Sequence, residues 1–316
     1  MNLKFTTPGK LKKAGIVGMN RRNVELIAQN NPRRLYPRVD DKLQTKQIIK
    51  QLDIAAPAMI GVAKTQFHVR QLGEFLSDCK QFVIKPSKGS GGKGILVITD
   101  RDGEDFVKPS GAKVTLKELQ HHVSNTLSGL YSLGGKPDVA MIEELVEFSD
   151  VFDGFSYEGV PDVRVIIFRG YPVMAMTRLS THESDGKANL HQGAVGLGID
   201  IATGRSLQAV QHGQPVEHHP DTGRKLSELK VPYWETLLLL ACRCYDVSEL
   251  GYLGADIVLD KSRGPLLLEL NARPGLAIQI ANGMGMLPRL QKIEALEHVG
   301  ETAEERVAFS IENFSS

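Results

Sequence analysis

Apolar and polar positions alternate as in a β-strand between Gly264 and Gly275, where the sequence reads GPLLLELNARPG. Leucines lead directly into Glu269, a pattern typical of a buried strand that ends in polar side chains. The period of two places Glu269 and Asn271 on one face of the extended chain. The preceding segment GADIVLD, with Asp256 near its start, has the pattern of a partner strand. We therefore predict a β-hairpin.

This hairpin presents oxygen atoms that suit a divalent metal. The carboxylate of Glu269 and the amide oxygen of Asn271, with Asp256 on the neighbouring strand, form a hard oxygen site of the kind that Mg²⁺ prefers. Arg273 follows at the next same-face position, and a Pro-Gly pair ends the strand with a turn signal. An ordinary hairpin with polar residues at its rim accounts for the same residues equally well.

The same kind of periodicity predicts the remaining elements. Helical spacing of apolar residues predicts one or two helices within 9–30 and others over 41–54, 68–79, 115–133, 233–247 and 286–297. Short apolar runs predict strands over 59–63, 82–85, 95–98 and 139–147, and a tight hairpin over 160–180 with its turn at 169–172. We expect irregular structure over 205–232 and a loose polar tail after residue 300.

A glycine-rich loop, KGSGGKG, spans Lys88 to Gly94 between two of these strands. Its glycines satisfy the letter of GxGxxG, but a Rossmann loop must open a helix, whereas ILVI predicts a strand here. A Walker A loop also fails, because no Ser or Thr follows a Gly-Lys pair at the required spacing. Glycine lets backbone amides approach phosphate closely. We favour a phosphate-binding glycine hairpin over a plain β-turn.

Composition excludes some classes of partner but identifies no catalytic or binding residues. The 316-residue chain is 41% hydrophobic and 24% charged, with a net charge of +1, which gives no basis for broad binding of nucleic acid or anionic membranes. Three cysteines do not form a disulfide framework, so we expect a reducing compartment. No run reaches the roughly 18 apolar residues of a membrane span, and the N-terminus lacks the apolar core of a signal peptide. We expect a cytoplasmic protein.

Six segments taken together resemble the ATP-grasp superfamily, and most closely its RimK-type α-L-glutamate ligases. They are DKLQTKQIIKQLDIAAP, FVIKPSKGSGGKGI, MIEELVE, PDVRVIIFRGYPVMAM, GKANLHQGA and GYLGADIVLDKSRGPLLLELNARPGL, in this order within about residues 41–280. The segments GMNRRN and HHPDTG are also similar to the sugar-transfer-associated branch of ATP-grasp proteins. The resemblance implies an α+β fold in which two α/β lobes with antiparallel sheets clamp ATP.

The resemblance also implies a domain organisation. We expect a helical N-terminal segment over 1–40, a smaller lobe with the glycine-rich loop over 41–140, a larger lobe with the adenine hinge and metal site over 141–300, and a polar tail over 301–316. The N-terminal segment stands in place of the full α/β lobe that usually begins an ATP-grasp enzyme. That lobe often helps to bind the acceptor substrate, so its replacement argues against glutamate as the substrate. The insert over 198–232 is a candidate source of replacement contacts.

Site residues carry over from the family motifs position by position. The phosphate-binding groups implied are Lys42, Lys85, Lys88, Gly89, Ser90, Gly91, Gly92, Lys93 and Gly94, with Lys85 also against the adenine. The hinge that reads the adenine edge is Glu143, Glu144, Leu145 and Val146, and Asp162 lies near the ribose. Groups around the triphosphate and acyl phosphate are Arg178, Lys187 and Asn189. The implied Mg²⁺ ligands are Asp256, Glu269 and Asn271.

The implied reaction is ATP-dependent ligation of a carboxylate and an amine through an acyl phosphate, with glutamate or another amino acid as a candidate substrate. We expect ATP with two Mg²⁺ ions, Mn²⁺ being an alternative, and small-molecule or peptide substrates. We infer that Arg273 clamps the substrate carboxylate, since guanidinium binds carboxylate bidentately. RimK-type ligases commonly have a small residue there. An ATP-grasp kinase and a non-catalytic nucleotide-binding protein remain as alternatives, and the sequence leaves the oligomeric state open.

The histidines allow more than one interpretation. His191, within ANLHQG, could contact phosphate or substrate, and a packed, hydrogen-bonded histidine is an equal alternative. His218 and His219 lie in a turn-like insert, where we expect surface or substrate-edge roles.

Overall fold

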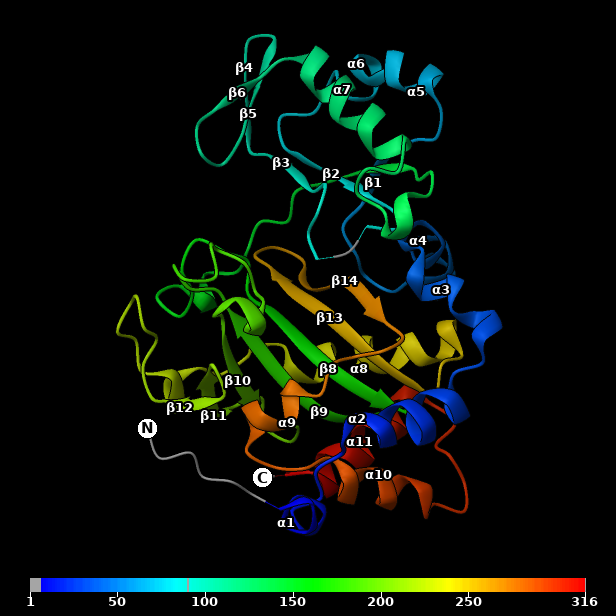
Figure 1. Cartoon of the computed structure of the whole chain (residues 1–316), viewed down its shortest axis with the longest axis vertical. Coiled ribbons are helices and arrows are strands. Elements are labelled where there is room, and N and C mark those ends of the chain that lie inside the picture. The colour runs from blue at the N-terminus through cyan, green and yellow to red at the C-terminus, as the bar shows by residue number, and fades with distance from the viewer. Residues whose placement is uncertain (1–6, 90, 316) are drawn as a thin grey trace. The chain divides into compact units, whose positions relative to one another are not determined.

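The computed structural model describes residues 7–89 and 91–315 (Figure 1). The chain forms two compact units. The larger unit comprises the chain up to Val39, Ile48–Ala55 and the chain from Phe148 onward, and the smaller unit comprises Asp40–Gln47 and Ala56–Glu147. Both combine helices with antiparallel sheets, which confirms the predicted α+β class.

In its described part, the smaller unit holds a four-stranded antiparallel sheet in the order β1-β7-β2-β3. These strands are β1 (Met59–Ala63), β7 (Ala140–Glu143), β2 (Phe82–Pro86) and β3 (Leu96–Ile98), and a small second sheet contains β4 (Asp100–Asp102), β5 (Asp105–Val107) and β6 (Lys113–Val114). The helices of this unit are α5 (Gln66–Arg70), α6 (Leu72–Phe75), α7 (Leu116–Leu127) and η3 (Leu133–Gly135), together with the first part of α4 (Lys42–Gln51), whose residues from Ile48 onward belong to the larger unit. The core joins Phe82 and Ile84 of β2 to Leu119 and Val123 of α7.

Among the described residues, the larger unit is built on a seven-stranded antiparallel sheet in the order β12-β11-β10-β9-β8-β13-β14. The strands are β8 (Asp162–Phe168), β9 (Tyr171–Leu179), β10 (Val195–Ile199), β11 (Ser206–Gln211), β12 (Gln214–Val216), β13 (Tyr252–Asp260) and β14 (Gly264–Asn271). Figure 1 shows β9, β8, β13 and β14 side by side. The β13–β14 hairpin predicted from the leucine-rich pattern is confirmed.

Helices complete the larger unit. They are α1 (Pro8–Lys13), α2 (Met19–Arg21), η1 (Arg22–Ala28), η2 (Arg33–Leu35), η4 (Asp150–Phe152), η5 (Leu190–Gln192), η6 (Leu226–Glu228), α8 (Trp234–Ser248), α9 (Ala277–Asn282), α10 (Leu287–Glu294) and α11 (Ala303–Asn313), with α3 (Pro37–Asp40) at the boundary between the units. The predicted N-terminal helical segment forms here, as three pieces within 8–28 rather than one or two helices. No helix in the described part is long and apolar enough to span a membrane.

The hairpin predicted over 160–180 forms as β8 and β9, joined by Arg169 and Gly170. Both residues have positive φ, 49° and 85°, as expected for a tight two-residue hairpin turn. Gly170 is also required by packing, because a Cβ there would lie 2.8 Å from Cδ of Arg306.

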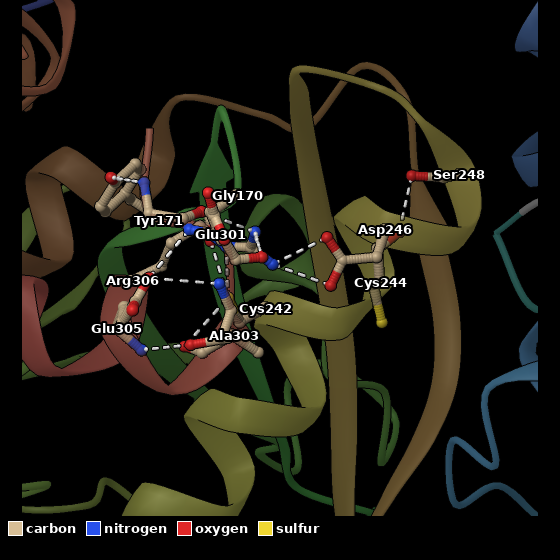
Figure 2. A network of polar contacts seen from close by, with 12 residues as sticks. Gly170, Tyr171, Cys242, Cys244, Asp246, Ser248, Glu301, Ala303, Glu305 and Arg306 are labelled. Atoms are coloured by element: carbon tan, nitrogen blue, oxygen red, sulfur yellow. Dashed lines mark hydrogen bonds and ion pairs between the residues drawn. The ribbon is translucent and has the colours of Figure 1, made fainter. Parts of the chain in front are cut away.

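The segment after residue 300 corrects the expectation of a loose tail, because it forms helix α11 and packs against α8 and β9. Thr302 and Glu305 form a capping box at its start, which satisfies amide groups that would otherwise lack partners. The buried guanidinium of Arg306 then anchors the helix by donating to both carboxylate oxygens of Asp246 on α8, at 2.7 and 2.8 Å (Figure 2).

The same guanidinium reaches a buried thiol. Arg306 Nε lies 3.3 Å from the sulfur of Cys242, and that thiol lies 2.8 Å from the carbonyl oxygen of Gly170 (Figure 2). Burial raises the pKa of Cys242 to about 11, so the thiol stays protonated and can donate to this carbonyl. The network ties α11, α8 and the β8–β9 turn together.

The range 205–232 is a second correction. It was expected to be irregular, but it adds β11 and β12 to the edge of the large sheet and contains η6. Both strands carry several polar residues (SLQAVQ and QPV), and β12 forms the edge of the sheet. The helix predicted over 68–79 also differs, since it divides into α5 and α6.

We predict that Arg306→Met lowers the free energy of unfolding by about 2–3 kcal/mol, because it removes a buried charge-assisted network. The matched control is Arg243→Met, which breaks an exposed ion pair between the same two helices, Arg243 to Glu304 at 3.0 Å, and should cost less than about 1 kcal/mol. Urea denaturation measures both. Equal losses would contradict the anchoring role of Arg306.

Candidate functional site

In the smaller unit, two lysines converge on one buried carboxylate. Lys85 of β2 and Glu143 of β7 lie on the same face of neighbouring strands, and Lys85 Nζ is 2.6 Å from Glu143 Oε2. Lys46 Nζ is 3.2 Å from Glu143 Oε1. Since two cations share one anion, this buried cluster carries a net positive charge suited to an anionic ligand. Glu144, the next residue, is exposed on the opposite side.

The start of α4 and the glycine loop are linked. Asp41 caps the helix by accepting from the amide of Leu43 at 3.0 Å. Lys42 Nζ donates to the carbonyl oxygen of Gly89 at 3.0 Å, and the amide of Lys88 donates to Asp138 at 2.9 Å. These bonds fix the first end of the glycine loop to α4 and to the segment that precedes β7.

The glycine loop connects the antiparallel strands β2 and β3, as predicted. Gly91 and Gly92 have φ values of 63° and 75°, and no atom would lie within 4 Å of a Cβ at either position. Their backbone is therefore open to a ligand. Gly94 is required by packing, because a Cβ there would meet the ring of Tyr131 at 2.4 Å. Ser90, which the family motif includes, lies outside the described residues.

In the larger unit, strand register gathers charged side chains on one face of the sheet. Arg178 of β9 pairs with Asp162 of β8, and two residues along, Arg164 of β8 pairs with Asp256 of β13. Asp256 also pairs with Glu269 of β14. Because directly paired residues point to the same face, these five side chains form a row across four strands.

Two arginines and two aspartates of this row are directly ion-paired. Arg164 binds Asp256 bidentately, with Nε–Oδ1 at 2.7 Å and Nη2–Oδ2 at 2.6 Å. Arg178 binds Asp162 through Nε at 2.7 Å and through Nη2. The same Nη2 lies 2.9 Å from Asp256 Oδ2. We call these four residues the arginine–aspartate array; its formal charges cancel.

Burial and pairing act in opposite directions on the two aspartates. Burial raises the pKa of Asp162, and the charge of Arg178 only partly offsets this. Burial also disfavours the charged form of Asp256, but Arg178 and Arg164 outweigh it and hold its pKa at about 2. Asp256 is therefore firmly ionised at neutral pH.

Asp256, one of the three predicted metal ligands on the hairpin, is already hydrogen-bonded to other side chains. Asp256 already accepts from both arginines, and the side-chain amide of Asn271 donates to its Oδ2 at 3.2 Å. Within residues 7–89 and 91–315, no three or more His, Cys, Asp or Glu side chains are grouped to hold a metal ion. Glu269 and Asn271 do share one face of β14, as predicted, next to Asp256.

Three other predicted residues lie outside the array in this structure. Lys187 is exposed and lies 2.9 Å from Asp185. The side chain of Asn189 caps η5 by accepting from the amide of His191 at 3.0 Å. The guanidinium of Arg273 lies over the ring of Tyr36, 5.0 Å from its centroid.

Two residues missed by the sequence interpretation belong to these clusters. Lys46 follows Lys42 by one helical turn on α4, so its spacing was a usable signal. Arg164 follows Asp162 by two on a predicted strand, which places both on one face. Neither residue could be assigned to its cluster without knowing the position of its partner, Glu143 of β7 for Lys46 and Asp256 of β13 for Arg164.

His219 corrects the expectation of a surface role, because it is buried within the HHPDTG turn. Its Nε2 lies 3.0 Å from the carbonyl oxygen of Ser180, and its Nδ1 accepts from the amides of Asp221 and Thr222 at 3.3 and 3.4 Å. Nδ1 must therefore be unprotonated and Nε2 must carry the hydrogen. The side chain of Asp221 in turn accepts from the amide of His182 at 2.8 Å. The turn thus fixes the start of the loop that carries Lys187.

The chain matches the family model for sugar-transfer-associated ATP-grasp proteins over residues 21–295. This match confirms the predicted resemblance to the ATP-grasp superfamily and to that branch of it, without singling out the RimK type. No curated protein sequence is significantly similar to the chain.

Several solved ATP-grasp structures are similar in fold at low sequence identity. The ligase PsnB, complexed with a minimal precursor, is 13% identical with a TM-score of 0.45, over 84% of this chain and 62% of that one. D-alanine–D-alanine ligase from Bacillus anthracis is 14% identical with a TM-score of 0.43, over 87% and 66%. D-cycloserine synthetase DcsG is 14% identical with a TM-score of 0.47, over 87% and 73%. This chain thus spans about three fifths of the length of PsnB.

We predict that the buried His219 makes stability fall in mildly acidic solution. Burial lowers the pKa of His219, and the hydrogen bond to Ser180 only partly offsets this. Below about pH 6.5, the histidine of the unfolded chain therefore binds a proton more readily than the buried His219 of the folded chain. The free energy of unfolding is thus highest above that pH and decreases as the pH falls. His219→Gln should flatten this part of the stability profile and cost about 1–3 kcal/mol at pH 8. The exposed neighbour supplies the control, since His218→Gln should leave the profile unchanged. Urea denaturation between pH 5 and 8 checks this, and parallel profiles for the wild type and His219→Gln would refute it.

Proposed function

The chain belongs to the sugar-transfer-associated ATP-grasp family, and on that premise we propose that it is an ATP-dependent ligase that joins a carboxylate to an amine through an acyl phosphate. The observation that carries the proposal is the arginine–aspartate array with Glu269 and Asn271 beside it on one sheet face. An array of this kind combines cations for phosphate with oxygen donors for a metal ion.

In the smaller unit, we assign phosphate binding to the lysines. Lys85 and Lys46 share Glu143, so they retain positive charge to offer an anion. The open backbone at Gly91 and Gly92 suits contact with phosphate oxygens. The chain after Glu143 supplies backbone groups for the adenine edge, as the family motif implies for 143–146.

In the larger unit, we assign neutralisation of the transferring phosphoryl group to Arg178 and Arg164. Each guanidinium presents several N–H groups in a planar fork that matches phosphate as well as carboxylate. Both guanidinium groups are already largely removed from water beside Asp256. Moving their hydrogen bonds from carboxylate to phosphate oxygens therefore requires less desolvation free energy than transferring them from water into the site. Such an exchange would release Asp256 from its arginine contacts.

The residues present fit Mg²⁺ by the chemistry of their donor atoms. Glu269 and the oxygen of Asn271 would hold the ion, and Asp256 would join them once its arginines contact phosphate instead. When bound, the ion would offset the negative charge of the triphosphate.

The proposed chemistry conserves every atom. A carboxylate oxygen of the acid attacks the γ-phosphorus, and ADP leaves. The amine nitrogen then attacks the acyl carbon, the C–O bond to phosphate breaks, and the amine loses a proton to solvent or to the departing phosphate. The protein's task is positioning and charge neutralisation rather than nucleophilic attack. We assign contacts with the acyl phosphate to Lys187 and Asn189.

An ADP-release screen of candidate acids and amines, with product masses recorded, tests this function. The proposal predicts that ADP release requires both an acid and an amine and that the product is their amide. A stable phosphorylated product would indicate a kinase instead. Tight nucleotide binding with no turnover would indicate a non-catalytic nucleotide-binding protein.

We predict that Glu269→Gln lowers the rate of ADP release at least about a hundredfold, because it removes a charged oxygen donor while leaving the arginine–aspartate array paired. Asp256→Asn should abolish turnover as well, but it also leaves Arg164 with a weakened partner and should lower stability. The control is Asp150→Asn, which breaks an exposed ion pair with Lys261. Undiminished ADP release by Glu269→Gln would remove Glu269 from the site.

A further inference from the structure

A pocket of about 310 Å³ opens in the larger unit, with walls from η5, β11, the β11–β12 turn and α9. Its lining combines apolar side chains with two imidazoles: Leu190, His191, Val210, His212, Ala277 and Ile280. We propose that this pocket binds the acid substrate, and that this substrate is a small carboxylic acid with a branched or aromatic apolar chain, with or without an α-amino group. The proposal rests on the ligase function above and names its substrate class.

The floor of the pocket is apolar yet open to water. Ala277 and Ile280 are three residues apart on α9 and therefore lie on one side of it. Ile280 is 52% exposed, although Ile278 and Ala281 of the same helix are buried. An apolar ligand would remove this isoleucine from water, which is favourable in proportion to the area covered. The volume is at the small end of ligand pockets, which suits a single amino acid or a short acid.

The walls are held in place by side-chain hydrogen bonds between separate segments. His212 Nε2 lies 2.9 Å from Glu183, and Gln211 donates to the carbonyl oxygen of Gly193 at 2.9 Å. Gln208 donates to the carbonyl oxygen of Ile280 at 3.3 Å. The pocket is therefore built before a ligand arrives, which lowers the entropic cost of binding.

The pocket lies on the sheet face that carries the arginine–aspartate array. Gly196 of β10 pairs with Arg178 of β9, so a side chain at either position points to the same face. A Cβ at Gly196 would lie 2.8 Å from Leu190 and 3.4 Å from Ala281 of α9. Leu190 and α9 therefore cover that face one strand away from Arg178. The pocket and the array thus share one face of the sheet, with β10 between the pocket wall on β11 and the strand β9 that carries Arg178.

The polar groups of the pocket suit a carboxylate. An imidazole ring carries an N–H donor in both its neutral and its protonated forms. His191 directly follows the segment with Lys187 and Asn189, which we assign to the acyl phosphate. The acid would thus direct its carboxylate toward His191 and its apolar chain toward Ile280. In this arrangement Ile280 determines substrate specificity.

Isothermal titration calorimetry with the full chain tests the proposal directly, using L-leucine and 4-methylpentanoate as apolar probes and L-aspartate and L-lysine as polar ones. The expected result is saturable binding of both apolar acids, at least about tenfold tighter than that of either polar one. Ile280→Gln should weaken leucine binding about tenfold or more. The matched control is Val299→Gln, at a position that is 47% exposed and outside the pocket lining, which should leave binding unchanged.

Absence of saturable binding of both apolar acids, equal binding of aspartate and leucine, or an unaffected Ile280→Gln variant would each overturn the proposal. Separate titration with ADP and Mg²⁺ distinguishes this failure from that of the ligase function. Nucleotide binding and acid-dependent ADP release without leucine binding would overturn the pocket alone. Leucine binding without any nucleotide binding would leave a ligand pocket and overturn the ligase function on which its substrate role depends.

Discussion

The constraint on which the larger unit depends is the pairing of two buried aspartates with two partly buried arginines across β9, β8 and β13. Arg178, Asp162, Arg164 and Asp256 neutralise one another only because the strand register places them on one face. A slip of one residue in β13 would turn Asp256 to the opposite face, away from both arginines. Since an unpaired buried charge costs several kcal/mol, the array fixes the register of the sheet.

In our proposal the same array also serves chemistry. Its cations are held at hydrogen-bond distance by carboxylates. Asp256 keeps a pKa of about 2 because both arginines contact it. In our proposal a ligand phosphate takes over those contacts, and the freed carboxylate turns to the metal ion. In this proposal the same four side chains therefore stabilise the sheet and bind the ligand.

Much of the fold was predictable because local pattern and turn chemistry agree. The leucine run that ends in Glu269 and Asn271 predicted the β13–β14 hairpin, and the Arg-Gly turn predicted the β8–β9 hairpin. Helix α11 was missed although Thr302 and Glu305 form a capping box, because a polar amphipathic helix at a chain end gives a weak periodic signal. Strands β11 and β12 were missed because both carry several polar residues, so their apolar pattern is weak.

The site was less predictable than the fold, because its geometry arises from pairing between distant segments. Sequence patterns placed Asp162 and Arg164 on one face, but the partners of Arg164 are known only from the order of β9, β8 and β13. For His219, in contrast, the misleading signal was local. Its polar turn motif predicted an exposed side chain, but the ring is buried and accepts hydrogen bonds from backbone amides of the same turn. Roles for Lys187, Asn189 and Arg273 stay predictions.

The central claim is that the larger unit's charged sheet face promotes phosphoryl transfer from ATP to a carboxylate, and the fate of the carboxylate oxygen tests it most directly. The acid selected by the ADP-release assay would be labelled with ¹⁸O in its carboxylate and converted with ATP and amine. The released phosphate would then be analysed by ³¹P NMR. An acyl phosphate intermediate predicts one ¹⁸O atom in each phosphate. Amide formation with unlabelled phosphate would contradict the account.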